Sequence, residues 1–274
     1  MAIHAAQQAS FQPLSSQPSS SQRLDSQPLT YQQQGTGRHA QAAARLAIII
    51  DDIGYNLALG QRAVDLPGPI TYGVLPHTPL ANKLSQRALR RHPDKEIIIH
   101  MPMQSLHGKR LGPGGLLGNF DRNTFLETLR DALQQLPDAR GLSNHMGSYL
   151  TTLPDRMQWL MAELQQHGLF YLDSKTTTLG MARDAANDSR VPYLARDVFL
   201  DHDPSPKAIE RAFSRAKQLA RRKGMAVVVA HPYRSTLDFL EQQLPQLAAE
   251  GFAQVNASTA INVHNNVPRL AKRP

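Results

Sequence analysis

The sequence predicts an α/β fold in which β/α units surround a mainly parallel sheet, open or closed. Short apolar runs of strand length alternate along the chain with stretches of helical spacing, and at least four of the apolar runs end on an ionisable residue. With 274 residues, 41% of them hydrophobic, the chain is long enough to bury a full core. We therefore expect one large folded domain.

The first 45 residues differ in composition from the rest of the chain. They hold ten Gln and seven Ser, with repeated Gln-Pro steps and few apolar residues. Such a segment buries too little apolar surface to offset the chain entropy lost on folding. We predict a disordered tail or linker over 1–45, a folded domain over 46–267 and a basic C-terminal tail over 268–274.

The apolar runs define the expected strands. They are 46–50, 70–75, 97–99, 170–172, 198–200, 226–230 and 252–255. Between 97–99 and the next expected helix lies a glycine-rich stretch, 108–118, which lacks the strand-then-helix setting and the Lys-Ser/Thr ending of a phosphate-binding loop. It is predicted to be a mobile loop beside the rim that the carboxyl ends of the strands form.

Four stretches between the strands have helical periodicity. Their apolar stripes cover 125–136, 157–164, 209–220 and 237–247. The first stripe follows Asp121 and Asn123, either of which can cap a helix. The second begins after a proline, and the second and third end at glycines. The fourth opens on Ser235 and Asp238, spaced as in a capping box, and Pro245 predicts a kink in it.

Charge and composition exclude several classes. The net charge of +8 suits an acidic partner, but Lys and Arg are spread along the helices and are not grouped with aromatic residues, so we favour solubility and expect no nucleic-acid binding. The chain lacks cysteine, which excludes disulfides and thiolate ligands. It contains no apolar stretch of transmembrane length and no block typical of an export signal.

Ionisable residues stand where the apolar runs end. Asp51 and Asp52 follow the first run, and His100, Asp173 and His231 follow three later runs. Because the carboxyl ends of parallel strands share one rim, these side chains are expected to converge. Each has a structural alternative, since an Asp at a strand end often caps a turn and a lone His is often only a satisfied polar residue.

Together these residue types suggest a metal centre. Adjacent carboxylates on an extended segment point to opposite sides, so Asp52 can bind a cation while Asp51 accepts a proton. His100 and His145 would complete one carboxylate and two imidazoles, which leaves Zn²⁺ open positions for water and substrate. For His145 the alternative is a turn capped by Asn144 and a nearby serine.

Three further positions have supporting roles in this hypothesis. His231 precedes a proline, so its backbone is restricted, and its ring suits a general acid. Asp173 is expected to orient a ligand histidine or to pair with Lys175 or Arg196, a role beside the metal. The segment 201–203, Asp-His-Asp, resembles another metal cluster, although Asp203 can simply cap the helix that follows.

Five ordered segments resemble the divergent polysaccharide deacetylase family. They are Ile49-Ile50-Asp51-Asp52-Ile53-Gly54, His100-Met101-Pro102-Met103, Asn144-His145-Met146-Gly147-Ser148, Leu172-Asp173-Ser174-Lys175-Thr176 and Ala230-His231-Pro232-Tyr233. The resemblance spans about 46–263 and implies the irregular β/α barrel of polysaccharide deacetylases. It also implies that Asp51 is the base, that Asp52, His100 and His145 bind the metal, and that His231 is the acid.

The family resemblance implies a function and a location. Ordinary members carry both ligand histidines in one His-x-x-x-His motif, whereas here no histidine follows His100 at that spacing. The expected function is metal-dependent removal of an acyl group from an envelope or extracellular polysaccharide, and N-acetyl is the acyl group we favour. The expected location is the bacterial envelope or periplasm. The alternative is a glycan-binding envelope protein that keeps the fold with little or no turnover.

Overall fold

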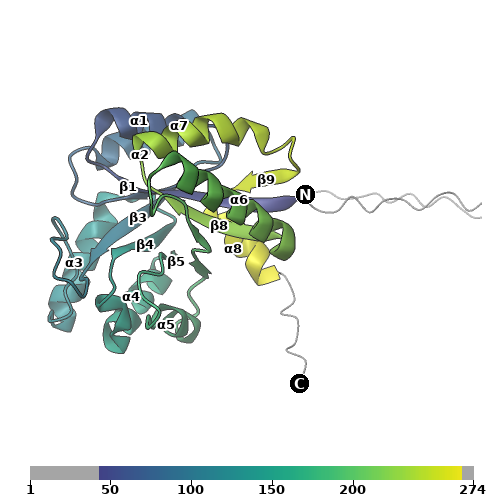
Figure 1. The fold of residues 1–274 in the computed structure, drawn as a ribbon. Helices are drawn as coiled ribbons and strands as arrows, with labels where there is room; N and C mark the ends of the chain where they lie inside the picture. Colours follow the sequence, from purple (N-terminus) through teal and green to yellow (C-terminus); the bar gives the residue numbers. More distant parts are fainter. Residues whose placement is uncertain (1–42, 267–274) are drawn as a thin grey trace, which may run out of the picture. The chain divides into compact units, whose positions relative to one another are not determined.

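The computed structural model describes residues 43–266 (Figure 1). The predicted tails at 1–45 and 268–274 lie outside the described residues, apart from residues 43–45. The strands are β1 (Ala44–Ile53), β2 (Thr71–Val74), β3 (Glu96–Met103), β4 (Gly141–Met146), β5 (Phe170–Asp173), β6 (Tyr193–Ala195), β7 (Val198–Phe199), β8 (Met225–Ala230) and β9 (Phe252–Val255). All seven predicted strands are therefore present.

Eight α-helices and two short 3₁₀ segments connect these strands within the described residues. They are α1 (Leu57–Asp65), α2 (Ala81–Arg91), α3 (Arg122–Gln135), η1 (Leu150–Thr152), α4 (Pro154–Gln166), α5 (Ala182–Asp188), α6 (Pro206–Lys223), α7 (Arg234–Gln243), η2 (Leu244–Gln246) and α8 (Ala257–Asn266). None of the helices described is long and apolar enough to cross a bilayer.

The described strands form one parallel sheet that curls into an irregular barrel, as predicted. Their order is β6-β5-β4-β3-β2-β1-β8-β7, and β9 pairs with the start of β1. The two edge strands, β6 and β7, are consecutive in the chain, and only Arg196 and Asp197 separate them. The backbone N–H groups of these two residues donate to Asp173 of β5 and Val227 of β8. This crossing brings the two edges of the sheet together.

The curled sheet has an outer and an inner apolar face. The outer face packs under the helices, which lie around the outside of the strands in Figure 1. The inner face is lined by alternate strand residues such as Ile49, Ile98 and Val229, and α8 covers it through Ala257 and Ile261. The core thus fills the amino-terminal part of the barrel, and the carboxyl ends of the strands remain for a site.

The helix signals are mostly confirmed, with one correction. Asp121 caps α3 by accepting a hydrogen bond from the Thr124 N–H, and α6 ends at Gly224 in the left-handed region. The capping box at Ser235 is wrong, because α7 begins at Arg234 and the Ser235 hydroxyl donates to a carbonyl of the β7–α6 loop instead. The fourth stripe is interrupted as expected, since α7 gives way to η2 at the proline.

Candidate metal centre

On three strands, the side chains that point into the barrel change from apolar to polar at the carboxyl end. Asp51 follows Ile49 on β1, His100 follows Ile98 on β3, and His231 follows Val229 just beyond β8. Successive residues of a strand point to opposite faces, so each polar side chain shares the inner face with the apolar residue two positions before it. The sequence therefore builds an apolar barrel floor with ionisable groups above it.

Asp52 reaches the same rim through an irregularity in β1. The pairing of β1 with β2 shifts between Ile50 and Ile53, and the φ angle of Asp52 is 59°. An extended segment would have turned Asp51 and Asp52 to opposite faces, and that expectation is wrong here. The left-handed conformation, which Asp adopts more readily than most residues, turns both carboxylates toward His100.

Asp52, His100 and His145 converge on a common point. Oδ1 of Asp52 lies 2.9 Å from Nδ1 of His145 and 3.4 Å from Nε2 of His100, and the two imidazole rings are 5.1 Å apart between centroids. One potential ligand atom of each residue lies within 4.8 Å of the others. A carboxylate oxygen and two imidazole nitrogens in this arrangement can hold a divalent ion.

The polar groups of this cluster fit such an ion. Both carboxylate oxygens of Asp51 and Oδ1 of Asp52 are buried and have no hydrogen-bond partner among residues 43–266. Buried carboxylates without donors are costly unless they face a cation or its bound water. Burial acts to raise the pKa of Asp52, but the adjacent imidazoles of His100 and His145 outweigh it and hold that pKa low. Asp52 is thus kept ionised, as a metal ligand must be.

Asp51 occupies a more enclosed position than Asp52. Its side chain lies over Gly73 of β2, where an added Cβ would overlap the carboxylate. Burial raises the pKa of Asp51, and the charges of His100 and His231 only partly oppose this. A carboxylate with a raised pKa holds a proton more readily, which is the property a general base requires.

The ring of His231 is held by the carboxylate of Asp201, which the sequence suggested as part of a separate metal cluster. Nδ1 of His231 lies 3.0 Å from Oδ1 of Asp201, and the His231 backbone N–H and the Thr236 hydroxyl donate to Oδ2. Burial lowers the pKa of His231, but Asp201 and the more distant Asp52 raise it above its ordinary value. Nε2 of His231 faces Asp52 at 3.9 Å, so the ring points into the site.

The Asp-His-Asp segment is therefore not a metal cluster of its own. Asp201 belongs to His231, and Asp203 accepts a hydrogen bond from the Ser205 N–H just before α6. The signal for Asp201 was present in the sequence, because it follows the apolar run 198–200 as the other site residues follow theirs.

Two residues of β4 support the centre, and neither was selected from the sequence for this role. The Ser143 hydroxyl lies 2.7 Å from Nδ1 of His100, which leaves Nε2 free for a ligand. Oδ1 of Asn144 accepts hydrogen bonds from the Tyr171 hydroxyl and the Ser174 N–H, while its amide donates to the carbonyl of Met146. These bonds fix the end of the strand that carries His145.

Asp173 ends β5, and Arg196, between β6 and β7, lies beside it. The carboxylate of Asp173 accepts hydrogen bonds from the Tyr193 hydroxyl at 2.7 Å and from the Lys175 N–H at 2.7 Å. The guanidinium of Arg196 donates to the carbonyls of Ser174 and Lys175. Both residues thus hold the loop after β5. Burial lowers the pKa of Arg196, and the charges of Asp173 and Asp51 partly oppose this shift.

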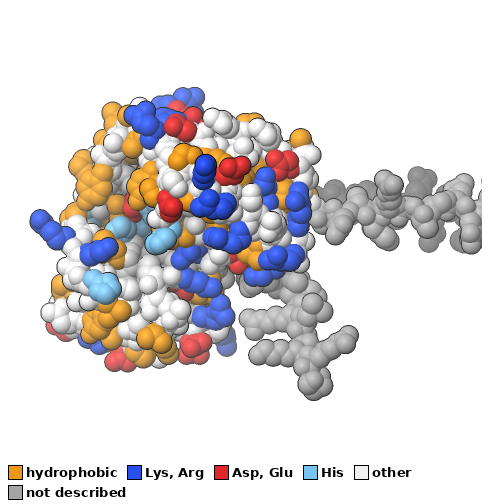
Figure 2. All heavy atoms as spheres, in the orientation of Figure 1, with side chains coloured by type: hydrophobic (Ala, Val, Ile, Leu, Met, Phe, Trp, Pro, Cys, Tyr) orange, Lys and Arg blue, Asp and Glu red, His pale blue; other side chains and the backbone are white. Residues whose placement is uncertain are grey.

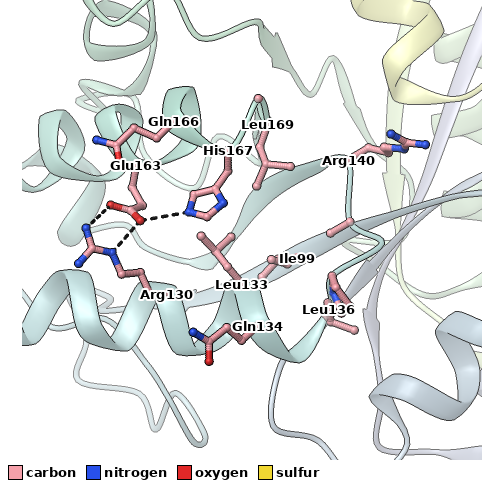
Figure 3. Close-up of a pocket in the computed structure, with 13 residues that line it drawn as sticks. Ile99, Arg130, Leu133, Gln134, Leu136, Arg140, Glu163, Gln166, His167 and Leu169 are labelled. Atoms are coloured by element: carbon pink, nitrogen blue, oxygen red, sulfur yellow. Dashed lines mark hydrogen bonds and ion pairs between the residues drawn. The ribbon is translucent and has the colours of Figure 1, made fainter.

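Clefts also occur away from this cluster. A groove of about 740 Å³ opens between α3 and α4, next to the segments that lead into the amino ends of β4 and β5 (Figure 3). Glu163 is buried in its wall and is paired with Arg130 and His167, and the Arg130 guanidinium lowers its pKa despite burial. The groove is therefore at the opposite end of the strands from the metal centre.

Comparisons with known proteins agree with the sequence resemblance. The model of the family described as divergent polysaccharide deacetylase matches residues 48–261. An uncharacterized protein of Haemophilus influenzae is 34% identical over 206 residues, which cover 75% of this chain and 73% of that protein. The uncharacterized protein YibQ of Escherichia coli K12 is 33% identical over 220 residues, covering 80% and 68% of the two chains.

Solved structures share the fold at lower identity. An uncharacterized protein of Agrobacterium tumefaciens aligns with a TM-score of 0.77 and 22% identity, covering 81% of this chain and 90% of that one. A deacetylase solved with substrate aligns with a TM-score of 0.51 and 13% identity, covering 81% and 92%. At these identities the likeness shows a common fold.

Proposed function

The chain belongs to the divergent polysaccharide deacetylase family, and from this premise we propose that it is a metal-dependent hydrolase that removes N-acetyl groups from a polysaccharide of the bacterial envelope. Asp52, His100 and His145 would hold the ion, and Zn²⁺ suits this mixture of one carboxylate and two imidazoles. When bound, the ion supplies polarisation of the acyl carbonyl and lowers the pKa of its water.

The residues around the proposed ligands have distinct roles in this reaction. Asp51 accepts the proton of the attacking water at its buried carboxylate, since its raised pKa favours protonation. His231 gives a proton from Nε2 to the leaving amine, and Asp201 holds the ring by Nδ1 and favours its charged form. Ser143 keeps the ring of His100 in the tautomer that leaves Nε2 available.

The observation that carries the proposal is the convergence of the Asp52 carboxylate and two imidazoles on one point, beside the second, buried carboxylate of Asp51. Asp51 and Asp52 are adjacent in the sequence, yet the pKa of Asp51 is raised and that of Asp52 is lowered. Neighbouring carboxylates with pKa values shifted in opposite directions indicate one group that exchanges protons and one that stays charged. His231 then supplies the acid on the other side of the site.

The experiment measures metal and acetate separately. Purified protein should carry close to one equivalent of a divalent ion, and Ala at position 52, 100 or 145 should remove it. Asp51→Asn and His231→Ala should retain the ion but lose acetate release from acetylated oligosaccharides by about two orders of magnitude or more. Asp203→Asn, which changes an exposed carboxylate just beyond the same rim, is the matched control and should retain activity.

Two results would overturn the assignment. Unchanged metal content in the His145→Ala protein would remove that residue from the site. If metal-loaded wild type releases no acetate from a broad panel of glycans but binds one of them, the protein is a glycan-binding member of the family and the hydrolase proposal fails.

A further inference from the structure

Among the described residues, the most exposed of the large hydrophobic side chains lie at one rim of the barrel. Within the described residues, the large apolar side chains with substantial exposure are Tyr55, Leu57, Leu106, Leu179 and Tyr233, at 57, 39, 61, 73 and 46%. Each lies in a segment that follows the carboxyl end of β1, β3, β5 or β8. Single exposed apolar residues are ordinary, but their restriction to one end marks an interaction surface.

These residues flank the candidate metal centre. The ring of Tyr233 stacks on His231 with centroids 5.6 Å apart. The backbone N–H of Leu106 donates to the Ser148 hydroxyl beyond the end of β4, and a Cβ at Gly112 of the same loop would contact the Tyr55 hydroxyl. In Figure 2, pale-blue histidines lie in a hollow with orange hydrophobic side chains beside them. Whatever covers this apolar rim also covers the site.

Basic residues accompany the apolar ones on three separate loops. Leu106 is followed by Lys109 and Arg110 in the loop before α3, and Leu179 shares its loop with Lys175. Tyr233 is followed directly by Arg234. These four basic side chains are exposed, and the one acidic residue in the loops 104–121, 174–181 and 231–233 caps α3.

We propose that this rim docks on an anionic lipid surface. Leucine and tyrosine side chains enter the boundary between headgroups and acyl chains, while neighbouring Lys and Arg are attracted to anionic headgroups. A sugar chain binds through hydrogen bonds and through stacking of its rings on flat aromatic faces, and the exposed leucines at positions 106 and 179 offer neither. Docking in this way turns the metal centre toward the membrane, and it does not depend on the hydrolase assignment.

The test is flotation of the full-length protein with vesicles of phosphatidylcholine, with and without phosphatidylglycerol. Wild type should float with the anionic vesicles and much less with the neutral ones. Lys109→Ala/Arg110→Ala should weaken binding about 25-fold, from about fivefold for each basic residue near an anionic surface. Leu106→Ala/Leu179→Ala should weaken it about tenfold or more.

A matched charge control separates docking by the rim from attraction by net charge. Arg90→Ala/Arg222→Ala removes two exposed charges at the carboxyl ends of α2 and α6, away from the rim, and should leave flotation unchanged. Equal loss in this control would overturn the proposal, as would absence of wild-type flotation. Binding to soluble polygalacturonate with no binding to vesicles would likewise overturn it and assign the rim to an acidic glycan. Melting temperatures check that all variants are folded.

Discussion

Replacing Ser143 by Ala tests whether the hydrogen bond to His100 sets the affinity for metal. Ser143 is fully buried and only 3% of His100 is exposed, so water cannot replace the lost hydroxyl. The 2.7 Å contact to Nδ1 fixes the ring with Nε2 toward Asp52. Removing such a supporting contact typically lowers metal affinity 10- to 100-fold. That range corresponds to about 1.4 to 2.7 kcal/mol of binding free energy, and full burial favours its upper half.

The assay is competition for Zn²⁺ with a chromophoric chelator at fixed pH. Ser174→Ala is the matched control, because this serine lies just beyond β5 and its buried hydroxyl has no hydrogen-bond partner among residues 43–266. In the metal-free protein, Ser143→Ala should also lower the free energy of unfolding by about 1 to 3 kcal/mol, since Nδ1 of His100 loses its partner. A Kd for Zn²⁺ within twofold of wild type would refute the reasoning.

Three further changes have defined outcomes. Gly73→Ala should lower the free energy of unfolding in urea by roughly 1 to 3 kcal/mol, because the new Cβ overlaps the Asp51 carboxylate. Asp201→Asn should lower the pKa of His231 in an NMR titration, and an unchanged value would exclude the assigned contact. Burial lowers the pKa of Lys95 to about 8. Between pH 8 and the unfolded pKa near 10.5, the unfolded state binds more protons than the folded state, so folding becomes more favourable as pH rises. Over this range the free energy of unfolding of wild type should therefore rise by up to roughly 3 kcal/mol relative to that of Lys95→Met.

The strands that carry the site were predictable where apolar runs end abruptly. Asp51, His100 and His231 each follow a run that alternates between the two apolar faces, and parallel order brings such ends to one rim. β4 was not predicted, because Ser143 and Asn144 make a buried strand look like a loop. Their polarity is satisfied by side chains of β3 and β5, which are distant in sequence. The local sequence pattern cannot reveal hydrogen bonds between side chains that are far apart in the sequence.

The partner of His231 was missed for a related reason. The run 198–200 was predicted to be a strand, but Asp201 at its end was grouped with His202 and Asp203 as a separate cluster. The following prolines favoured the loop interpretation. Only the pairing of β7 with β8 places Asp201 beside His231, and pairing between strands 30 residues apart leaves no local signal.

If Asp52, His100 and His145 hold the ion as proposed, the bulge in β1 explains how this chain can do without a His-x-x-x-His motif. His100 pairs with Ser143, so His145 lies two residues, or about 6.6 Å, farther toward the carboxyl end of the sheet. The positive φ of Asp52 places one carboxylate oxygen within 3.4 Å of both imidazoles and spans that step. A left-handed Asp costs of order 1 kcal/mol, which strong metal binding would readily offset. The second histidine can therefore come from the neighbouring strand, provided that β3 and β4 keep this register.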